Sequence, residues 1–450
     1  MTASRDDAAL GRLGLRRGTT GTTSLWSRAA VVVIALVAMV SSLAFAVVAS
    51  RDALDTIGHE SGPQVVATAD LYFALSDADT QVATAILLGE TDPDATEAAA
   101  REYARLRGDI AASLLEAHRL AGAAATQRDT IESIMTYYGE YEQLAAEALL
   151  QSEQAAYTEG QVPEAVLEAY RAASDLMQGW ILPQAYNLTL ENGTIVREAH
   201  DEAQSAIRFG IPAVALAGAA ALAALIWLQV YFAQTFRRLL SPALLVATAV
   251  TGLYLYTGVV VLDAERDALA EAKTDGFDAA LSLERAKAIS NSLHADQIRF
   301  LLDPERADVY EQTYFDKAQQ LVYVEAGNLE EYAASLEGAP SDTGLVAVGL
   351  DGSASGDDAL AAYTALIRAD AAMRASDAPP SERLATVVAA IADYEAALKD
   401  LSGRHLDLFA DAIGEGESAI ADFAFLLPAA LVSLAVFTFS GIVPRLRELS

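Results

Sequence analysis

The chain has 450 residues, with 30 Lys and Arg against 62 Asp and Glu, a formal net charge of −32 and no cysteine. This charge excludes a basic nucleic-acid-binding protein, because a strongly acidic surface repels phosphate. The lack of cysteine excludes disulfide scaffolds, thiolate metal sites and cysteine-based catalysis. Because 53% of the residues are nevertheless hydrophobic, the apolar and acidic residues must occupy different stretches of the chain.

Four uninterrupted apolar runs are long enough to cross a bilayer, which takes about 20 residues. None of the four runs contains a charged side chain. The second run begins at Phe209, directly after Arg208. They predict transmembrane helices at residues 29–49, 208–233, 242–262 and 423–443. The first run also allows a secretory signal cleaved after Ala44-Phe45-Ala46. Its length favours an uncleaved anchor, because the apolar core of a signal peptide has roughly 7–15 residues.

The arginines predict the orientation, because cytoplasmic segments carry an excess of Lys and Arg. Three short segments that flank the apolar runs contain arginines with few acidic residues: 1–28, 234–241 and 444–450. These segments lie on one side of the membrane if each run crosses once. We therefore expect a multi-pass plasma-membrane protein with both termini in the cytoplasm and a disordered N-terminal segment. The acidic segments 50–207 and 263–422 would then both lie outside.

The layout of the first half recurs in the second. Arg51-Asp52-Ala53-Leu54 is echoed by Arg266-Asp267-Ala268-Leu269, and Leu87-Leu88 by Leu301-Leu302, at similar offsets, which indicates an internal repeat. Both outer segments are rich in Ala, Leu, Glu and Arg, with apolar residues every three or four positions, which predicts helices. Glycine, proline and polar breakers divide each segment into four: 89–92, 122–126, 160–163, 303–304, 338–356 and 378–380.

The predicted fold class is therefore all-α. We expect an integral membrane protein with four transmembrane helices and two tandem extracytoplasmic four-helix bundles. The first and last helix of each bundle would run continuously into a transmembrane helix.

No catalytic or metal-binding constellation is recognisable. The five histidines are isolated, and the carboxylates are scattered as on solvated helix faces. We expect no enzyme activity, no cofactor and no metal ion.

Pro212 and Pro428 lie just inside the second and fourth predicted transmembrane helices. They are candidate hinges, because proline frees a backbone carbonyl and permits a kink. The alternative is that proline is simply tolerated near the start of a membrane helix.

The turns farthest from the membrane are the surface that a partner protein would reach. Candidate docking residues lie in these turns: Gly89, Pro93, Pro163, Pro304 and Pro379. The segments predicted to be cytoplasmic are too short to fold into a kinase, a cyclase or a signalling coil. We therefore expect a separate cytoplasmic protein to read any state that is sensed outside.

A helical bundle between two membrane helices resembles the sensor part of bacterial chemoreceptors and histidine kinases, although their HAMP and output modules are missing here. The tandem layout more specifically resembles the actinobacterial GlnX-type membrane proteins. Five short stretches carry that resemblance: Leu75-Ser76-Asp77-Ala78-Asp79, Ala83-Thr84, Leu87-Leu88-Gly89, Leu182-Pro183 and Tyr186-Asn187. It covers the whole chain as topology and implies two partners. One is the surface lipoprotein GlnH, which binds glutamate, aspartate or glutamine, and the other is the soluble Ser/Thr kinase called protein kinase G.

We therefore expect a non-catalytic transmembrane relay that detects an amino-acid-loaded binding lipoprotein and informs a cytoplasmic Ser/Thr kinase. Two alternatives stay open. The bundles themselves could bind a small molecule, and Arg299 or Arg105 would then be the candidate contacts for an anionic ligand. The chain could also be a structural envelope protein without a signalling role.

Overall fold

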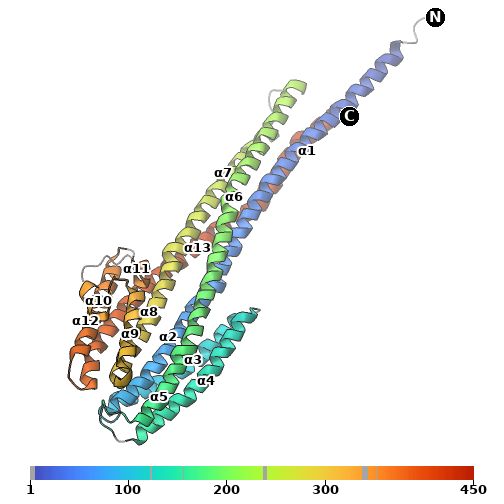
Figure 1. Cartoon of the computed structure of the whole chain (residues 1–450). Coiled ribbons are helices and arrows are strands. Elements are labelled where there is room, and N and C mark those ends of the chain that lie inside the picture. Colours follow the sequence, from blue (N-terminus) through green and yellow to red (C-terminus); the bar gives the residue numbers. More distant parts are fainter. Residues whose placement is uncertain are drawn as a thin grey trace. The chain divides into compact units, whose positions relative to one another are not determined.

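The computed structural model describes residues 6–121, 124–155, 157–236, 241–336, 343–350 and 352–449. In these residues every regular element is a helix and none is a strand, which confirms the predicted all-α class (Figure 1). The contacts divide the chain into two compact units. The apolar unit comprises Met1–Asp55, Glu198–Ala270 and Ala412–Ser450, and the polar unit comprises Thr56–Arg197 and Glu271–Asp411.

Four helices contribute to the apolar unit: α1 (Asp6–Asp55), α6 (Leu182–Phe236), α7 (Pro242–Glu271) and α13 (Pro380–Leu449). Among the residues that the structure describes, three continuous helical stretches are long and apolar enough to cross a membrane: Leu25–Leu88, Glu164–Gln234 and Pro242–Leu302. The fourth predicted transmembrane helix lies within α13, whose described residues hold a shorter apolar stretch, Leu431–Gly441. These helices are compatible with a membrane protein, while the count of four spans and their orientation stay predictions.

α1 begins at Asp6, so residues 6–28, which we expected to be disordered, are helical. The physical reason is that adding residues to an existing helix avoids the cost of nucleating a new one. The apolar run that follows Arg28 supplies that helix.

Small residues bring the helices of the apolar unit close together. A Cβ atom placed on Gly258 of α7 would lie 2.8 Å from the Leu43 side chain on α1. A Cβ atom on Gly441 of α13 would lie 2.9 Å from Leu244 on α7. Membrane helices commonly associate through such small residues, because there the backbones can approach each other.

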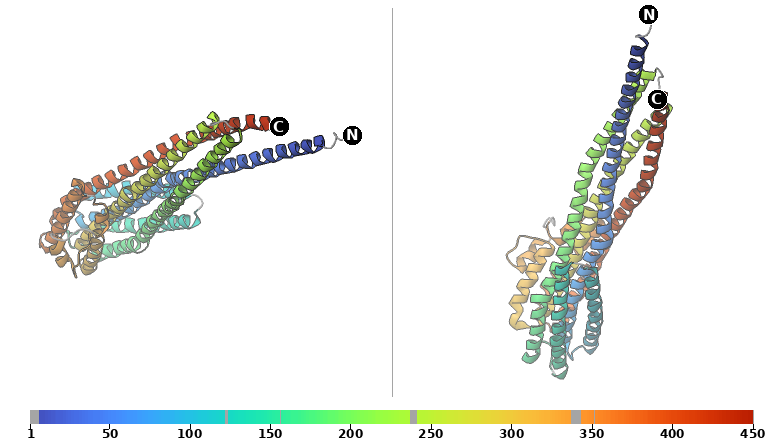
Figure 2. Two further views of the ribbon diagram at one scale, coloured as in Figure 1. Left: turned by 90° about the horizontal axis from the view of Figure 1, so that it is seen from above. Right: turned by 90° about the vertical axis from the view of Figure 1, so that its right-hand side faces the viewer.

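The first half of the polar unit has the four helical rods that we expected, running alongside one another (Figure 2). They are α2 (Gly62–Leu88), α3 (Pro93–Leu120), α4 (Ala125–Gln154), and α5 (Glu164–Leu176) with the start of α6. Gly89 ends α2 with a φ of 48°, a left-handed conformation that favours glycine. Asp92 then caps α3 by accepting a hydrogen bond from the Ala95 amide at 3.1 Å, and Pro93 takes the first helical position.

The second half has one break that we did not predict, and the predicted break at 338–356 contains the short helix α11. Its helices are α8 (Ala279–Leu302), α9 (Ala307–Leu321), α10 (Leu329–Ser335), α11 (Leu345–Val348), α12 (Ala354–Ala375) and α13. The additional break follows Leu321, where Val322 is extended. Gly327 and Asn328 are the sequence signal for it, because the Asn328 side chain caps α10 by accepting from the Glu331 amide at 2.9 Å.

The two predicted bundles belong to one compact unit. α2 packs side by side with α8. The buried core around α2 to α5 takes in Leu301 and Leu302 of α8 and Val387 of α13. The core is shared because α2 packs against both α3 and α8, and α8 packs against both α2 and α9.

Within the described residues, three π-helical segments interrupt the long helices, and the sequence analysis predicted none of them. They are η1 (Thr56–Ser61), η2 (Met177–Ile181) and η3 (Ala272–Asp278). η1 joins α1 to α2 and η3 joins α7 to α8, so each half has a π-helical segment at the corresponding place. Such segments are rare and are frequent at functional sites.

Candidate functional site

The structure brings together the four turns in which we placed the docking residues. A Cβ atom on Gly89 would lie 3.2 Å from the ring of Tyr157, whose hydroxyl donates a hydrogen bond to the Ile86 carbonyl at 2.7 Å. The Ser381 amide donates to the Glu159 carboxylate at 3.0 Å. The first turn therefore contacts the second, and the second contacts the fourth.

Ion pairs join the third turn, at Asp303-Pro304, to the start of α5, which directly follows the second turn. Arg171 of α5 pairs with Glu164 at 2.9 Å, directly after Pro163. The same guanidinium contacts Asp303 at 2.6 Å and Glu305 at 3.0 Å. Burial acts to raise the pKa of Asp303, but Arg171 and Tyr310 lower it overall, so the carboxylate stays charged. We name residues 89–93, 159–163, 303–306 and 377–381 the distal surface.

Each predicted docking residue has a definite place on the distal surface. Pro93 and Pro304 are exposed and begin α3 and the 3-10 helix η4 (Pro304–Arg306). Pro163 is half-buried and precedes α5, and Pro379 is exposed just before α13. The half-buried Gly89 forms the turn between α2 and α3. The exposed acidic side chains of this surface are Glu90, Asp92, Glu305 and Asp377, and the cationic side chain of Arg306, 38% exposed, pairs with Asp175.

A buried ion network that we did not predict joins the two halves of the polar unit. Asp79 of α2 accepts hydrogen bonds from Arg299 of α8 at 2.5 Å, from Ser174 at 3.2 Å and from Tyr141 at 3.3 Å. The side chain of Asp79 is 0% exposed and that of Arg299 is 1% exposed. Arg299 also pairs with Asp296 at 2.5 Å, one helical turn before it.

Lys317 of α9 completes the network by pairing with Asp296 at 2.6 Å. Two cations and two carboxylates therefore balance, as buried charges require. Burial lowers the pKa of Lys317, although Asp296 opposes this. Burial also acts to lower the pKa of Arg299, but Tyr170 and the neighbouring carboxylates raise it well above its usual value, so the guanidinium stays charged.

The two arginines that we considered for an anionic ligand are both engaged within the chain. Arg299 donates to Asp79, Asp296 and, at 3.2 Å, to the Tyr170 hydroxyl. Arg105 is exposed on α3 and pairs with Glu102 and Asp109. The Arg299 side chain is 1% exposed, whereas that of Arg105 is 56% exposed, so a contact of Arg105 with an anionic ligand stays a prediction.

One side chain of α13 contacts η3 and the first residue of α2, which directly follows η1. A Cβ atom on Gly276 in η3 would lie 2.8 Å from Phe409, and a Cβ atom on Gly62 after η1 would lie 3.3 Å from the Phe409 ring. Phe277 packs on Phe409 with 5.8 Å between the ring centroids. Phe409 thus lies beside η3 and beside the residue that follows η1.

His405, one helical turn before Phe409, ties η3 to the loop before α12. Its Nδ1 lies 2.6 Å from the Asp275 carbonyl oxygen, and its Nε2 lies 3.0 Å from the Gly349 carbonyl oxygen. Each ring nitrogen of His405 therefore lies within hydrogen-bond distance of a backbone carbonyl oxygen.

The structure places both hinge candidates inside helices. Pro212 lies within α6 and Pro428 within α13, and both residues are exposed. Each helix continues beyond its proline, so a hinge role stays a prediction.

Among the residues that the structure describes, no group of three or more His, Asp or Glu side chains is placed to hold a metal ion.

One half-buried carboxyl, that of Glu395, predicts how the stability of the polar unit depends on pH. Burial raises the pKa of Glu395 on α13 to about 7, Asp77 of α2 raises it further, and Lys287 of α8 opposes them. A pKa raised in the folded state means that stability is fully present below the usual value of 4.5 and is lost as the pH rises to about 7.

Glu395→Gln is therefore expected to remove most of this loss, on the order of 2–3 kcal/mol between pH 4.5 and 7. Urea unfolding of the full chain at several pH values measures it. Asp393→Asn, at an exposed position of the same helix, is the matched control and should keep the wild-type slope. An unchanged slope in Glu395→Gln would contradict the prediction.

Comparison with known proteins finds a family match for one part of the chain. Residues 53–201 match the family model described as the actinobacterial sensor domain. The match takes in Thr56–Arg197, which is the first half of the polar unit. No curated protein and no solved structure matches the chain significantly. The match supports an actinobacterial sensor protein and indicates a sensing role.

Proposed function

We propose that this chain is a non-catalytic transmembrane relay. Its distal surface would dock an extracytoplasmic binding lipoprotein loaded with an amino acid, and its membrane helices would pass that state to a cytoplasmic Ser/Thr kinase. The observation that carries the proposal is the sensor-domain match over residues 53–201, which contains two of the four turns of the distal surface.

The contacts among the turns support docking at the distal surface. Ion pairs of Arg171 and the hydrogen bond between Ser381 and Glu159 hold turns from both halves in one arrangement. A partner that binds there contacts both halves at once. The exposed acidic side chains favour a partner with a basic face, because complementary charge speeds the encounter.

The continuity of two helices supports the relay step. The stretches Leu25–Leu88 and Pro242–Leu302 are each helical throughout and each include one π-helical segment. Shifts of about 1–2 Å along helices are a known form of switching. A displacement of α2 or α8 would therefore reach the membrane-crossing part of the same helix.

Binding of a lipoprotein to the full chain in nanodiscs tests the proposal. The probe is an amino-acid-binding lipoprotein, measured without ligand and with glutamate, glutamine or aspartate. Docking should depend on the amino acid. No binding in any condition would overturn the proposal, and heat of binding from the amino acid alone would instead favour direct sensing by the polar unit.

Glu90→Arg on the distal surface is expected to weaken lipoprotein binding at least tenfold, because it reverses an exposed charge at the centre of one turn. The matched control is Asp129→Arg, a charge reversal near the start of α4, outside the four turns. Equal affinities of the two variants would show that the partner does not bind at the distal surface.

A further inference from the structure

Glu265 of α7 is a buried carboxyl of the apolar unit, just beyond the end of the third predicted transmembrane helix, 242–262. The residue is only 1% exposed. Its Oε1 and Oε2 atoms are both buried, and neither has a hydrogen-bond partner among the described residues. An ionised carboxylate in such a place is costly unless it is paired, so the packing fits the neutral, protonated form.

Two other helices close around this carboxyl. A Cβ atom on Gly416 of α13 would lie 3.3 Å from Glu265 Oε1 and 3.1 Å from the side chain of Leu54 on α1. Leu54 is also 1% exposed, and Gly416 is buried. The carboxyl therefore lies where α13 approaches α1 without a side chain of its own, against apolar atoms.

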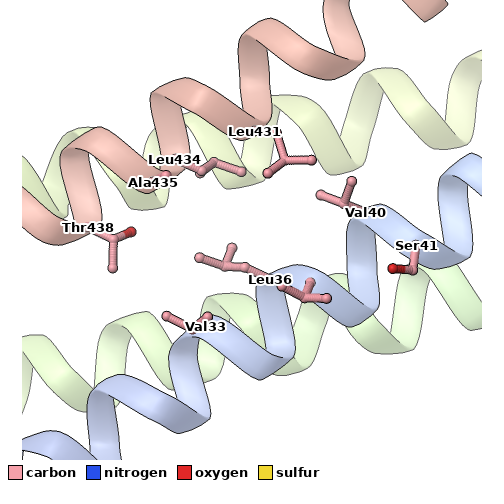
Figure 3. A pocket seen from close by; sticks show the side chains of 9 residues that line it. Val33, Leu36, Val40, Ser41, Leu431, Leu434, Ala435 and Thr438 are labelled. Carbon is pink, nitrogen blue, oxygen red and sulfur yellow. The ribbon is translucent and has the colours of Figure 1, made fainter.

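The contact between α1 and α13 at this level is local. Farther along the same two helices an apolar groove separates Leu36 and Val40 of α1 from Leu431 and Leu434 of α13 (Figure 3). The helices are thus in contact beside Glu265 and apart at the groove. The contact at Gly416 can therefore open without separating a continuously packed interface.

The predicted internal repeat places a serine at the matching position of α1. Ser50 and Glu265 each directly precede an Arg-Asp-Ala-Leu stretch. Each also lies two helical turns beyond Leu43 and Gly258, the residues at which α1 and α7 meet, and so on the same helix face. Ser50 is 0% exposed and its hydroxyl also lacks a partner. A serine does not titrate, so of these two matching positions only the one on α7 can gain or lose a proton.

No charged side chain offsets the burial of Glu265, because burial is the only cause that shifts its pKa. The charged side chains near this level of the four helices are exposed: Arg51 of α1, Arg208 of α6, Asp263 and Arg266 of α7, and Glu415 and Glu417 of α13.

His200 of α6 is the buried titratable group on the remaining helix, at 5% exposure. It lies ten residues from Gly210, which meets Ala46, whereas Ser50 lies four residues from Ala46. His200 is therefore about 9 Å farther along the helices than Ser50, at 1.5 Å per residue.

The surroundings of Glu265 decide between a proton and a metal ion. A metal cation needs several oxygen ligands at about 2–2.6 Å. The carboxyl has instead the methyl groups of Leu54 and the backbone of Gly416 beside it. In the described part of the chain no group of three or more His, Asp or Glu side chains is placed to hold a metal ion. A proton needs neither further ligands nor further space.

We propose that Glu265 is a proton-binding site that couples the packing of α7 against α1 and α13 to the pH outside the membrane. With the proton bound, the three helices pack as the structure shows. Loss of the proton leaves a buried charge, and the contact at Gly416 opens so that water reaches the carboxylate. The proposal rests on the membrane placement in the proposed function and adds the proton as a second input to the relay.

The pKa gives the direction of the response. Burial raises the pKa of Glu265 from 4.5 to about 7. A pKa raised in the packed arrangement means that its stabilisation is fully present below 4.5 and is lost as the pH rises through about 7. Acidic surroundings therefore favour the packed arrangement.

Infrared difference spectra of the full chain in nanodiscs test the protonation. They are recorded in the Glu395→Gln background, because that carboxyl also titrates near 7. The carbonyl stretch of a protonated carboxyl should disappear with a midpoint of about 7. Glu265→Gln should lack this band, and the matched control Glu271→Gln, at an exposed position of the same helix, should keep it. A midpoint at the usual 4.5, or the same band in Glu265→Gln, would overturn the proposal.

Amide hydrogen exchange in residues 263–269 tests the coupling to packing. Wild type and Glu265→Gln are compared at the same pH, which cancels the intrinsic pH dependence of exchange. The amide mimics the neutral carboxyl, so the two rates should agree within about fourfold at pH 5, and wild type should exchange at least tenfold faster at pH 8.5. The shift of the pKa from 4.5 to about 7 limits this ratio to about 300-fold.

Glu271→Gln should exchange like wild type at both pH values. Equal exchange of wild type and Glu265→Gln at pH 8.5 would overturn the coupling between the proton and the packing. Neither measurement involves a lipoprotein or a kinase, so failure of this proposal is distinguishable from failure of the proposed function.

Discussion

Arg299→Met is expected to destabilise the polar unit by about 3–5 kcal/mol, the usual loss when one partner of a buried ion pair is removed. The replacement leaves Asp79 without its cation and Asp296 with Lys317 alone. Methionine fills a similar volume, so the effect reports the lost charge rather than a cavity. Urea unfolding of the full chain in detergent micelles measures the free energy of unfolding.

Arg105→Met is the matched control for this prediction. Arg105 makes two ion pairs on the exposed face of α3, and such pairs contribute about 0–1 kcal/mol. A double variant, Arg299→Met with Asp79→Asn, should lose less than the sum of the two single losses, because the neutral amide that replaces the carboxylate leaves no unpaired charge at that position. Loss of under 1 kcal/mol in Arg299→Met would show that the network does not hold the halves together.

The helices and turns were largely predictable from local sequence patterns. Leu71, Leu75, Val82 and Ile86 recur at helical spacing, and all four are buried in the core of the polar unit. The turns at Gly89 and Pro163 follow from residue types that favour or end particular backbone conformations. Local patterns determine such features because the interactions involved lie within a few residues of each other.

The pairing of Asp79 with Arg299 was not predictable in this way. The two residues lie on different helices and meet only because α2 packs along α8. A signal was present, since Asp79 follows Ala78 on the helix face whose neighbours Leu75 and Val82 are buried. A charged residue on a buried face requires a partner, but nothing local indicates which of the 30 basic residues supplies it.

The π-helical segments and the assembly of the distal surface were missed for the same reason. Thr56–Ser61 and Ala272–Asp278 carry no composition that distinguishes a π-helix from an α-helix. Each turn of the distal surface was located individually, but the contacts between Glu159 and Ser381 depend on how the two halves pack. Both features depend on tertiary packing.

Phe409→Ala is expected to loosen both π-helical segments while leaving the distal surface intact. The half-buried ring contacts Gly62 beyond η1 and Phe277 in η3, so its removal opens space beside both. The expected loss of stability is about 2 kcal/mol, below the 3–5 kcal/mol of a fully buried phenylalanine. Amide hydrogen exchange in 56–61 and 272–278 should accelerate at least tenfold, because local opening becomes easier.

Leu408→Ala is the matched control, since Leu408 precedes Phe409 on the same helix and is 40% exposed. It should leave exchange in both segments within about twofold of wild type, as surface substitutions usually have small effects. Lipoprotein affinity should be unchanged in both variants, because the distal surface is formed by other residues. If Phe409→Ala accelerates exchange in only one segment, the two π-helical segments are not coupled through this side chain, and α2 and α8 would have to relay independently of each other.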